Sequence, residues 1–445
     1  MTSPVPLAEG FPVFSEADWH AAVAKVRHGS ASADSLDPIA AGQLHGRRLG
    51  ARPIIGRPPG RPWTIVQRIG GAYATLEREI SDAATGGATG VELVFAGSSH
   101  PLPGRLTGDA VPGIASALAA APEGLQIRVD IGSAAIPDAL LDLAATRNAE
   151  LVSAFDPAAA MAVRGSADDA SEAVRLAARA LDARKVAGRA VIADGRLWHA
   201  GGANEEQELG VVLATFVAYL RLLAAPDRIG IALAVDADQF RGIAKLRAIR
   251  LLLARIAEIA ALPALSPPIH AETAWRMLGT RDPHMNILRA TSAAFAAAVG
   301  GADSITVLPF DALAGRSDGH ADRLARNTQT ILAEEAQLFR VADPAAGSGA
   351  IEALTSAFAA AAWQRFQAIE AEGGIVAAIA EGSLLRNIAE TREARLARVA
   401  SGDMRLVDVD PPRGDAGARV RRTPVRQAKT LTFKRLAAPF EAPPP

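Results

Sequence analysis

The sequence contains no cysteine, and this absence removes several classes of chemistry at once. Disulfides, thiolate metal sites and cysteine nucleophiles are excluded, and a cysteine-free chain fits a reducing cytoplasm, which is where we expect the protein. Aromatic residues are also scarce, at 4 % of the chain with only two tyrosines, while alanine is abundant. This composition favours close helix packing over aromatic-rich binding surfaces.

An excess of charge of either sign is missing too. The 47 Lys and Arg residues and 48 Asp and Glu residues leave a formal net charge of −1, so a general nucleic-acid binder, which needs a clustered positive face, is disfavoured. The longest apolar runs, such as 210–220, fall short of the ~20 residues of a membrane span. The first 14 residues lack the basic and then apolar pattern of a secretory signal. We therefore expect a soluble globular protein without nucleic-acid or membrane partners.

Short apolar or β-branched runs recur from about residue 90 onward, with helical patterns between them. These runs are residues 90–97, 125–132, 150–156, 189–195, 229–236, 269–275, 304–311 and 340–344. Asn204 is placed to cap one intervening helix, and Leu246, Ile249, Leu253 and Ile256 form the apolar stripe of another. Eight strand–helix units predict an α/β fold, a (β/α)8 TIM barrel. A doubly wound open sheet is the rival, but no glycine-rich phosphate turn follows an early strand.

The chain divides by composition into three parts. Residues 1–50 form an N-terminal arm, with a short amphipathic helix capped by Ser15 and carrying Trp19, Val23 and Val26 on one face. Residues 51–385 form the barrel. Residues 386–445 form a basic, proline-containing tail, which we expect to be extended and to lie on the barrel or on a partner.

The stretch RPWTIVQRI, residues 61–69, predicts a strand that carries a cation. Pro62 fixes φ, Trp63 is a large anchor, and the β-branched residues that follow favour extended backbone. Arg68 points to the same face as Thr64 and Val66. Arg68 therefore either meets a ligand or occupies the place of a group that did.

Candidate catalytic and metal-binding residues are scattered. The eight histidines show no i, i+4 pair or His-x-His spacing, so no metal site is predicted. His199 and His270 lie near strands, where a structural role is favoured over catalysis. The strand carboxylates Glu92, Asp130, Asp236, Glu272 and Asp303 could take part in acid–base chemistry if they converged, but the sequence does not show which way they face. The loop 343–350 could cradle a phosphate or simply form a turn with Ser348 as a cap.

Several longer stretches resemble the methylmalonyl-CoA mutase family over most of residues 50–400. They are RPWTI (61–65), GVELVFAGSSH (90–100), GGANEEQELGVVLATFVAYLR (201–221), HAETAWRMLGTRDPHMNILR (270–289) and VADPAAGSGAIEALT (341–355). The resemblance implies a (β/α)8 barrel in which a coenzyme A ester threads the centre. In catalytic members a C-terminal flavodoxin-like domain, for which this sequence has no counterpart, presents adenosylcobalamin to the barrel mouth for a radical rearrangement.

The resemblance fails at the positions that hold the substrate in catalytic members. Val66 stands for an arginine, Arg68 for the tyrosine near the radical, Glu92 for a serine, Ala96 for an aspartate, Pro268 for an arginine, Ala271 for a serine and Thr306-Val307-Leu308 for His-Thr-Asn. The replacements remove cations and add bulk or negative charge, and a carboxylate such as Glu92 repels phosphates. We therefore predict a barrel filled by its own side chains and stripped of anion-binding arginines, with no catalytic residue. Arg61 and Thr64 match substrate-binding contacts to coenzyme A and are interpreted as vestigial. His199 lies about two residues from the position of the family's catalytic histidine.

The resemblance favours one functional hypothesis and leaves two others open. The first is the small (beta), non-catalytic subunit of a heterodimeric methylmalonyl-CoA mutase, whose large (alpha) subunit carries adenosylcobalamin, so that this chain binds no cofactor. The arm sequence FPVFSEADWHAAVAKV, residues 11–26, also resembles a small-subunit beginning. The alternatives are an active mutase that uses a separate cobalamin-domain chain, and a regulatory module that binds acyl-CoA without turnover.

Overall fold

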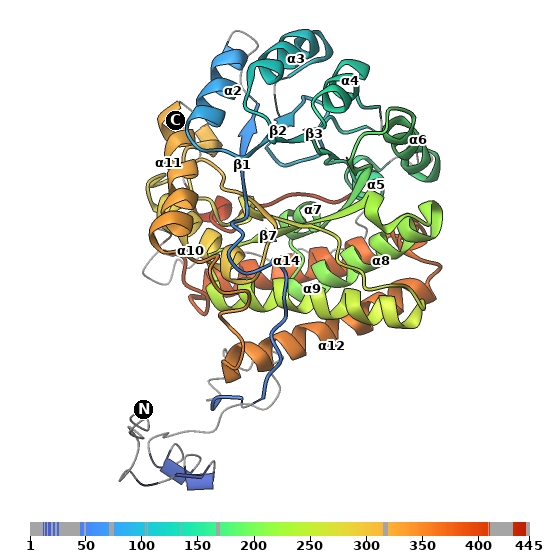
Figure 1. Ribbon diagram of the computed structural model, residues 1–445. Helices are drawn as coiled ribbons and strands as arrows, with labels where there is room; N and C mark the ends of the chain where they lie inside the picture. Colours follow the sequence, from blue (N-terminus) through green and yellow to red (C-terminus); the bar gives the residue numbers. More distant parts are fainter. Residues whose placement is uncertain are drawn as a thin grey trace, which may run out of the picture.

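Parallel strands form the centre of the molecule in the computed structural model, and helices surround them (Figure 1). The structure describes residues 45–441 except 49, 71–74, 103, 105, 134, 166–169, 315–318, 408 and 410–429, together with scattered residues between 12 and 25. The strands are β1 (Thr64–Ile69), β2 (Gly90–Val94), β3 (Gln126–Asp130), β4 (Leu151–Ser153), β5 (Gly188–Arg189), β6 (Val191–Asp194), β7 (Ile229–Val235), β8 (Ile269–Thr273) and β9 (Ser304–Thr306).

The strand order is β5-β4-β3-β2-β1-β9-β8-β7-β6, with every pairing parallel. Only Ala190 separates β5 from β6, so these two segments are one interrupted strand that pairs with β4 on one side and β7 on the other. The sheet therefore returns to its starting point with eight strand positions. This confirms the predicted (β/α)8 barrel.

One predicted strand is wrong and one barrel strand was not counted. Residues 340–344 form turns, because the Asp343 carboxylate accepts hydrogen bonds from Arg247 and from the Ile54 backbone instead of leaving the segment to pair in a sheet. The first barrel strand is instead β1, the rigid stretch with Trp63 before it. β1 pairs with both β2 and β9 and so closes the ring at its start.

Helices follow most strands and bury one face against the barrel. They are α2 (Leu76–Thr85), α3 (Val111–Ala120), α4 (Asp138–Thr146), α5 (Pro157–Arg164), α6 (Ala170–Ala183), α7 (Gly195–Gly201), α8 (Glu205–Leu223), α9 (Gln239–Ile259), α10 (Met285–Val299), α11 (Gly319–Thr330), α12 (Gly349–Ala371), α13 (Ile375–Glu381) and α14 (Ser383–Ser401). A short 3-10 turn, η4 (Trp275–Met277), follows β8. The helix α12 lies outside α8 and α9 as a second layer (Figure 1).

Two of the predicted helices carry the features read from the sequence. Asn204 caps α8 in a reciprocal capping box with Gln207. On α9 the predicted stripe of Leu246, Ile249, Leu253 and Ile256 is buried. In the arm, the Ser15 hydroxyl accepts a hydrogen bond from the Asp18 backbone, as a helix cap would, whereas the predicted apolar stripe lies outside the described residues.

The predicted tail begins inside a helix, since α14 spans residue 385. Residues 430–441 are described and lie against the barrel, whereas most of the basic residues, from Arg419 to Lys429, fall outside the described part of the chain. The three-part division of the chain remains a prediction. Among the described residues, no helix has both the length and the apolar character needed to cross a membrane.

Candidate functional site

Charged side chains occupy the inside of the barrel at one level of the ring. The strand register places Glu92 on β2 between Arg68 on β1 and Arg128 on β3. Glu92 and Arg128 are almost fully buried. The Arg128 Nε atom lies 3.7 Å from Glu92 Oε1, which is an ion pair too long for a hydrogen bond.

Arg196 lies at the centre of this cluster and comes from the first turn of α7, just after β6. Its Nη1 atom is 3.3 Å from Glu92 Oε1 and 3.1 Å from Glu272 Oε2, and its Nη2 atom is 2.9 Å from Asp194 Oδ2. Burial alone lowers the pKa of Arg196, but the carboxylates of Asp194, Glu272 and Glu92 outweigh it and hold that pKa well above its usual value. The guanidinium therefore bridges three strands as a permanent cation.

His100 completes the cluster on the opposite side of Glu272. Its Nε2 atom is 2.7 Å from Glu272 Oε1, while its Nδ1 atom faces the Leu102 N–H at 3.0 Å and Arg68 Nη1 at 2.9 Å. Because Nδ1 faces two donors, it accepts, and the ring proton lies on Nε2. Burial raises the pKa of Glu272, but His100 and Arg196 together hold it well below its usual value.

His199 belongs to a separate buried network. Its Nδ1 atom lies 2.9 Å from Glu208 Oε2, which also accepts from Lys245 Nζ at 2.7 Å. Its Nε2 atom is 3.6 Å from Asp236, which binds Arg276 at 3.0 Å. Every charged neighbour of His199 thus has a partner of its own. The buried Nε2 atom of His199 has no hydrogen-bond partner among the described residues, and the structural role favoured from the sequence stays a prediction.

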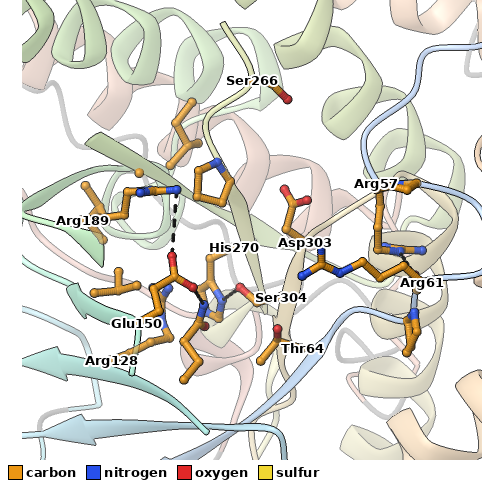
Figure 2. Close-up of a pocket in the computed structure, with 18 residues that line it drawn as sticks. Arg57, Arg61, Thr64, Arg128, Glu150, Arg189, Ser266, His270, Asp303 and Ser304 are labelled. Atoms are coloured by element: carbon orange, nitrogen blue, oxygen red, sulfur yellow. Dashed lines mark hydrogen bonds and ion pairs between the residues drawn. The ribbon is translucent and has the colours of Figure 1, made fainter. Parts of the chain in front are cut away.

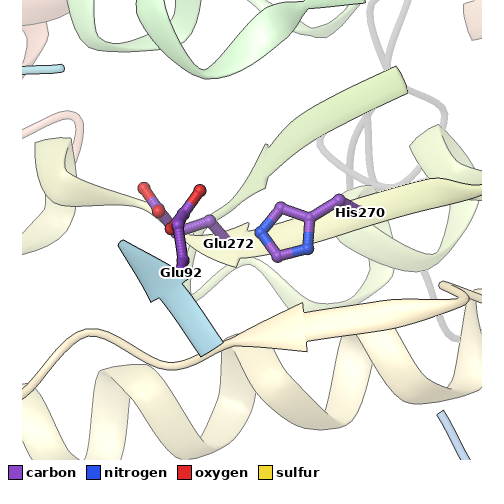
Figure 3. Close-up of side chains that lie close together, drawn as sticks. All are labelled: Glu92, His270 and Glu272. Carbon is purple, nitrogen blue, oxygen red and sulfur yellow. The ribbon is translucent and has the colours of Figure 1, made fainter. Parts of the chain in front are cut away.

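The residues Glu92, His270 and Glu272 bring ligand atoms within 4.8 Å of one another (Figure 3). His270 Nδ1 lies 2.9 Å from Ser304 Oγ, and its Nε2 atom has no hydrogen-bond partner among the described residues. Figure 3 shows the imidazole edge turned toward the two carboxylates. However, Arg196 already lies between these carboxylates, and Arg128 lies beside Glu92. A divalent cation here would face guanidinium groups at close range, so the donor atoms suit a metal but the local charge does not.

A cavity of about 280 Å³ opens at the amino-terminal end of the barrel, where the strands begin (Figure 2). Its charged lining residues are Arg57, Arg61, Arg128, Glu150, Arg189 and Asp303. The predicted pair Arg61 and Thr64 both line this cavity, so the structure brings them together. Arg128 and His270 also line it, whereas Glu92, Glu272 and Arg196 do not. Glu92, Glu272 and Arg196 therefore lie beyond the cavity along the barrel interior, and Arg128 lies between them and the cavity.

The prediction that the barrel interior has lost its arginines is wrong. The interior is filled by side chains, but it has not been stripped of arginines, because Arg128 and Arg196 are both buried in it. Glu92 consequently does not present an uncompensated negative charge. Neither arginine was predicted to face the interior. Arg128 does carry a signal, because it lies in a predicted strand two residues before Asp130 and alternation puts these two on one face.

The remaining sequence candidates are distributed over other parts of the fold. Of the strand carboxylates, Glu92 and Glu272 converge in the charged cluster, while Asp303 pairs with Arg250 at 2.6 Å near the cavity. In the loop before α12, which could have held a phosphate, the Gly347 N–H donates a hydrogen bond to the Glu352 carboxylate. Ser348 stands at the cap position but makes no side-chain cap hydrogen bond. Pro268 lines the cavity, and Val66, Ala271, Thr306 and Leu308 are buried.

Comparison with known proteins agrees with this architecture. The family model described as methylmalonyl-CoA mutase matches residues 169–435, which is more than half of the chain. The chain belongs to the methylmalonyl-CoA mutase family. The match covers the strands and helices from α6 onward and reaches into the segment that follows α14.

Several similar proteins carry small-subunit names, and others are named methylmalonyl-CoA mutase without a subunit name. The protein named probable methylmalonyl-CoA mutase small subunit of Mycobacterium tuberculosis (strain ATCC 25618 / H37Rv) is 41 % identical over 290 residues, 60 % of this chain and 46 % of that protein. The methylmalonyl-CoA mutase small subunit of Streptomyces virginiae is 45 % identical over 255 residues, 55 % of this chain and 41 % of its own. The small subunit of Propionibacterium freudenreichii subsp. shermanii is 40 % identical over 224 residues, 48 % of this chain and 35 % of its own. The matched region thus spans less than half the length of each.

Proposed function

We propose that this chain is the small (beta), non-catalytic subunit of a heterodimeric, adenosylcobalamin-dependent methylmalonyl-CoA mutase, a complex that interconverts methylmalonyl-CoA and succinyl-CoA. The observation that carries the proposal is the position of Arg196. Its guanidinium lies inside the barrel between Glu92 and Glu272, beyond the floor of the cavity. A thioester that threads the barrel centre, as the family resemblance implies, needs this space.

The charged cluster would be costly to displace. Arg196, Glu92 and Glu272 are each at most 3 % exposed, and the Arg196 guanidinium forms an ion pair with both carboxylates. Moving the arginine aside leaves two buried carboxylates without their principal partner, and breaking such a buried pair costs about 3 to 5 kcal/mol. A substrate acyl group offers no positive charge in compensation. The cluster therefore supports a structural interior and opposes a catalytic one.

Adenosylcobalamin does not fit the described residues of this chain. The sequence has two Asp-x-His motifs, at residues 282–284 and 318–320, and the His284 side chain is 76 % exposed and stacks on Phe310 with ring centroids 5.1 Å apart. His320 is also exposed. We place the cofactor and the reaction on the large (alpha) subunit, in the cytoplasm. This chain contributes contact surface through its arm, its barrel helices and its tail.

The test is co-expression with a large subunit. We expect a one-to-one complex that survives affinity purification and size exclusion, with mutase activity unchanged when Arg61 of this chain is replaced by alanine. Recovery of this chain as a monomer beside a fully active large subunit would contradict the proposal. Activity that falls in step with the Arg61→Ala change would show instead that this barrel handles substrate.

A second candidate function is binding of acyl-CoA without turnover, and the amino-terminal cavity favours it. The cavity lining contains four arginines and two carboxylates, so positive charge is in excess there. The arginines are Arg57, Arg61, Arg128 and Arg189, and the carboxylates are Glu150 and Asp303. Guanidinium groups are suited to binding phosphates. Calorimetry with methylmalonyl-CoA decides between the two. Heat that saturates at micromolar ligand and is lost in Arg61→Ala, but kept in Arg255→Ala on the outer surface, would favour a binding module over a scaffold.

A further inference from the structure

Residues 430–441, here called the strap, cross the carboxyl-terminal end of the barrel. The Leu431 N–H donates to the Ala162 carbonyl of α5 at 2.8 Å, the Lys434 N–H to the Ala200 carbonyl of α7 at 3.2 Å, and the Leu436 N–H to the Arg276 carbonyl of η4 at 3.1 Å. These three elements follow β4, β6 and β8, so all of them lie beyond the ends of the strands. The strap therefore runs along the part of the rim above β4, β6 and β8, which are neighbouring positions of the ring (Figure 1, red).

Side chains fix the strap in place as well. Leu431 and Leu436 are each 6 % exposed. Leu431 lies so close to α7 that a Cβ on Gly201 would be 2.4 Å from it, which means that the helix has no room for a side chain there. Phe433 packs edge-on against Trp275, with ring centroids 6.4 Å apart.

Polar contacts hold both ends of the strap. Arg392 of α14 donates to the Thr432 carbonyl at 2.8 Å. At the far end, Arg435 donates to the Leu278 carbonyl at 3.1 Å and pairs with Glu441 at 2.8 Å. The Glu441 carboxylate also accepts from the Thr280 N–H. The strap is thus built into the loops of the mouth and does not merely lie on the surface.

We infer that the strap occupies, along one part of the barrel rim, the surface on which a cofactor-bearing domain would dock, so that this chain cannot complete an active site of its own. The inference rests on the proposed function, in which cobalamin belongs to the large subunit. It adds the physical reason: a docking domain would need the backbone carbonyls and the apolar surface of α7 and η4, and the strap already occupies both. The carboxyl ends of the strands are where barrel enzymes place their chemistry, so a segment docked at this end stands in the way of such a domain.

The test compares the full chain with a strap-release variant, Leu431→Asp with Leu436→Asp. The matched control is Val407→Asp, which adds the same charge at a side chain that is 67 % exposed. Trypsin cleavage after Lys434 and Arg435, followed by mass spectrometry, measures docking of the strap. We expect cleavage in the release variant to be at least about tenfold faster than in wild type, with the control unchanged, because an undocked segment is open to protease.

A second experiment measures whether a cofactor-bearing domain can dock once the strap is released. A separate flavodoxin-like domain loaded with adenosylcobalamin is mixed with each full-length variant, and its binding is measured. We expect binding to the release variant and none to wild type or to the control. Three results would each overturn the inference. They are equal cleavage rates in wild type and the release variant, binding of the domain to wild type as strong as to the release variant, and no binding of the domain to the release variant. Failure of the proposed function appears separately, as absence of a complex with the large subunit. If the double aspartate variant does not fold, Leu431→Ala with Leu436→Ala serves the same comparison.

Discussion

At the scale of single residues, Arg196 gives the interior its character, because it is the group that joins the carboxylates of three strand positions. Replacing it with methionine keeps the volume and removes the charge, which leaves Glu92 and Glu272 buried without their shared partner. We expect Arg196→Met to lower the free energy of unfolding by about 3 to 5 kcal/mol, measured by urea denaturation.

The control for this change is an arginine whose ion pair is open to water. Arg255 pairs with Glu258 at 2.6 Å, and both side chains are more than half exposed. Arg255→Met should cost about 0 to 1 kcal/mol. Adding Glu92→Gln and Glu272→Gln to Arg196→Met should recover part of the loss, since two of the three carboxylates that lose Arg196 are then neutral. A loss below about 1 kcal/mol for Arg196→Met would show that the cluster is not held by this residue.

Asp156 makes stability depend on pH. Burial raises the pKa of Asp156 to about 6, although its carboxylate accepts from the Asp194 N–H at 2.8 Å and from the Tyr219 hydroxyl at 2.5 Å. The folded chain therefore keeps a proton that the unfolded chain releases near pH 4. Stability falls as pH rises from about 4 to about 6 and levels off above, by about 3 kcal/mol from this group.

The measurement is the free energy of unfolding from pH 4 to pH 8 for wild type, Asp156→Asn and the exposed control Asp227→Asn. The Asp156→Asn variant is expected to be less stable throughout, because the Asp194 N–H and the Tyr219 hydroxyl bond to different carboxylate oxygens and an amide keeps only one of these acceptors. Its profile should lose the decline between pH 4 and pH 6, whereas the control should keep it. Parallel profiles for all three proteins would contradict the assignment.

The residues that the sequence predicted best are those whose role is local. Arg61 and Thr64 were expected together, and they share the cavity because they lie three positions apart at the entrance of one strand. Arg196 and His100 could not be predicted, because their meeting at Glu272 depends on loops after two different strands. Inward or outward facing of a strand residue follows alternation only once the register is known, so Glu92 could not be paired with Arg128 from the sequence.

At the scale of elements, helix α8 shows a case in which sequence and structure agree and the energy can be tested. Asn204 Oδ1 accepts a hydrogen bond from the Gln207 N–H, and Gln207 Oε1 accepts one from the Asn204 N–H, both at 3.1 Å. Asn204→Ala should cost about 1 kcal/mol in urea denaturation, as loss of a cap usually does.

Helix α12 supplies the matched control for the cap. Ser348 stands at its N-cap position but makes no side-chain cap hydrogen bond. Ser348→Ala should therefore stay within about 0.5 kcal/mol of wild type. Equal losses at the two caps would mean that the residue type and not the hydrogen bond sets the effect. The comparison also shows why a serine before a helix, read from sequence, is a weaker signal than a capping box.

At the scale of the whole molecule, closure of the barrel depends on a short seam. The predicted run 189–195 appears as two segments, β5 and β6, and only β5 pairs with β4. Sequence periodicity predicted eight strands and the closed architecture, because each strand–helix unit is repeated. It counted the wrong eighth strand, because the turn at 340–344 looks apolar while its Asp343 serves a buried ion pair.

The seam has a glycine that no other residue can replace. Gly188 has φ +144°, and a Cβ there would lie 1.7 Å from the Leu151 carbonyl oxygen, which is backbone of β4 and cannot move without breaking the pairing. Gly188→Ala should therefore cost more than about 4 kcal/mol or abolish folding, judged by soluble yield and thermal unfolding. Gly402, at the end of α14, has φ +81° and open space around it, so Gly402→Ala carries only the backbone strain, about 1 kcal/mol. If the two variants lose the same stability, strain alone explains both, and the barrel closes without depending on close contact between β4 and β5.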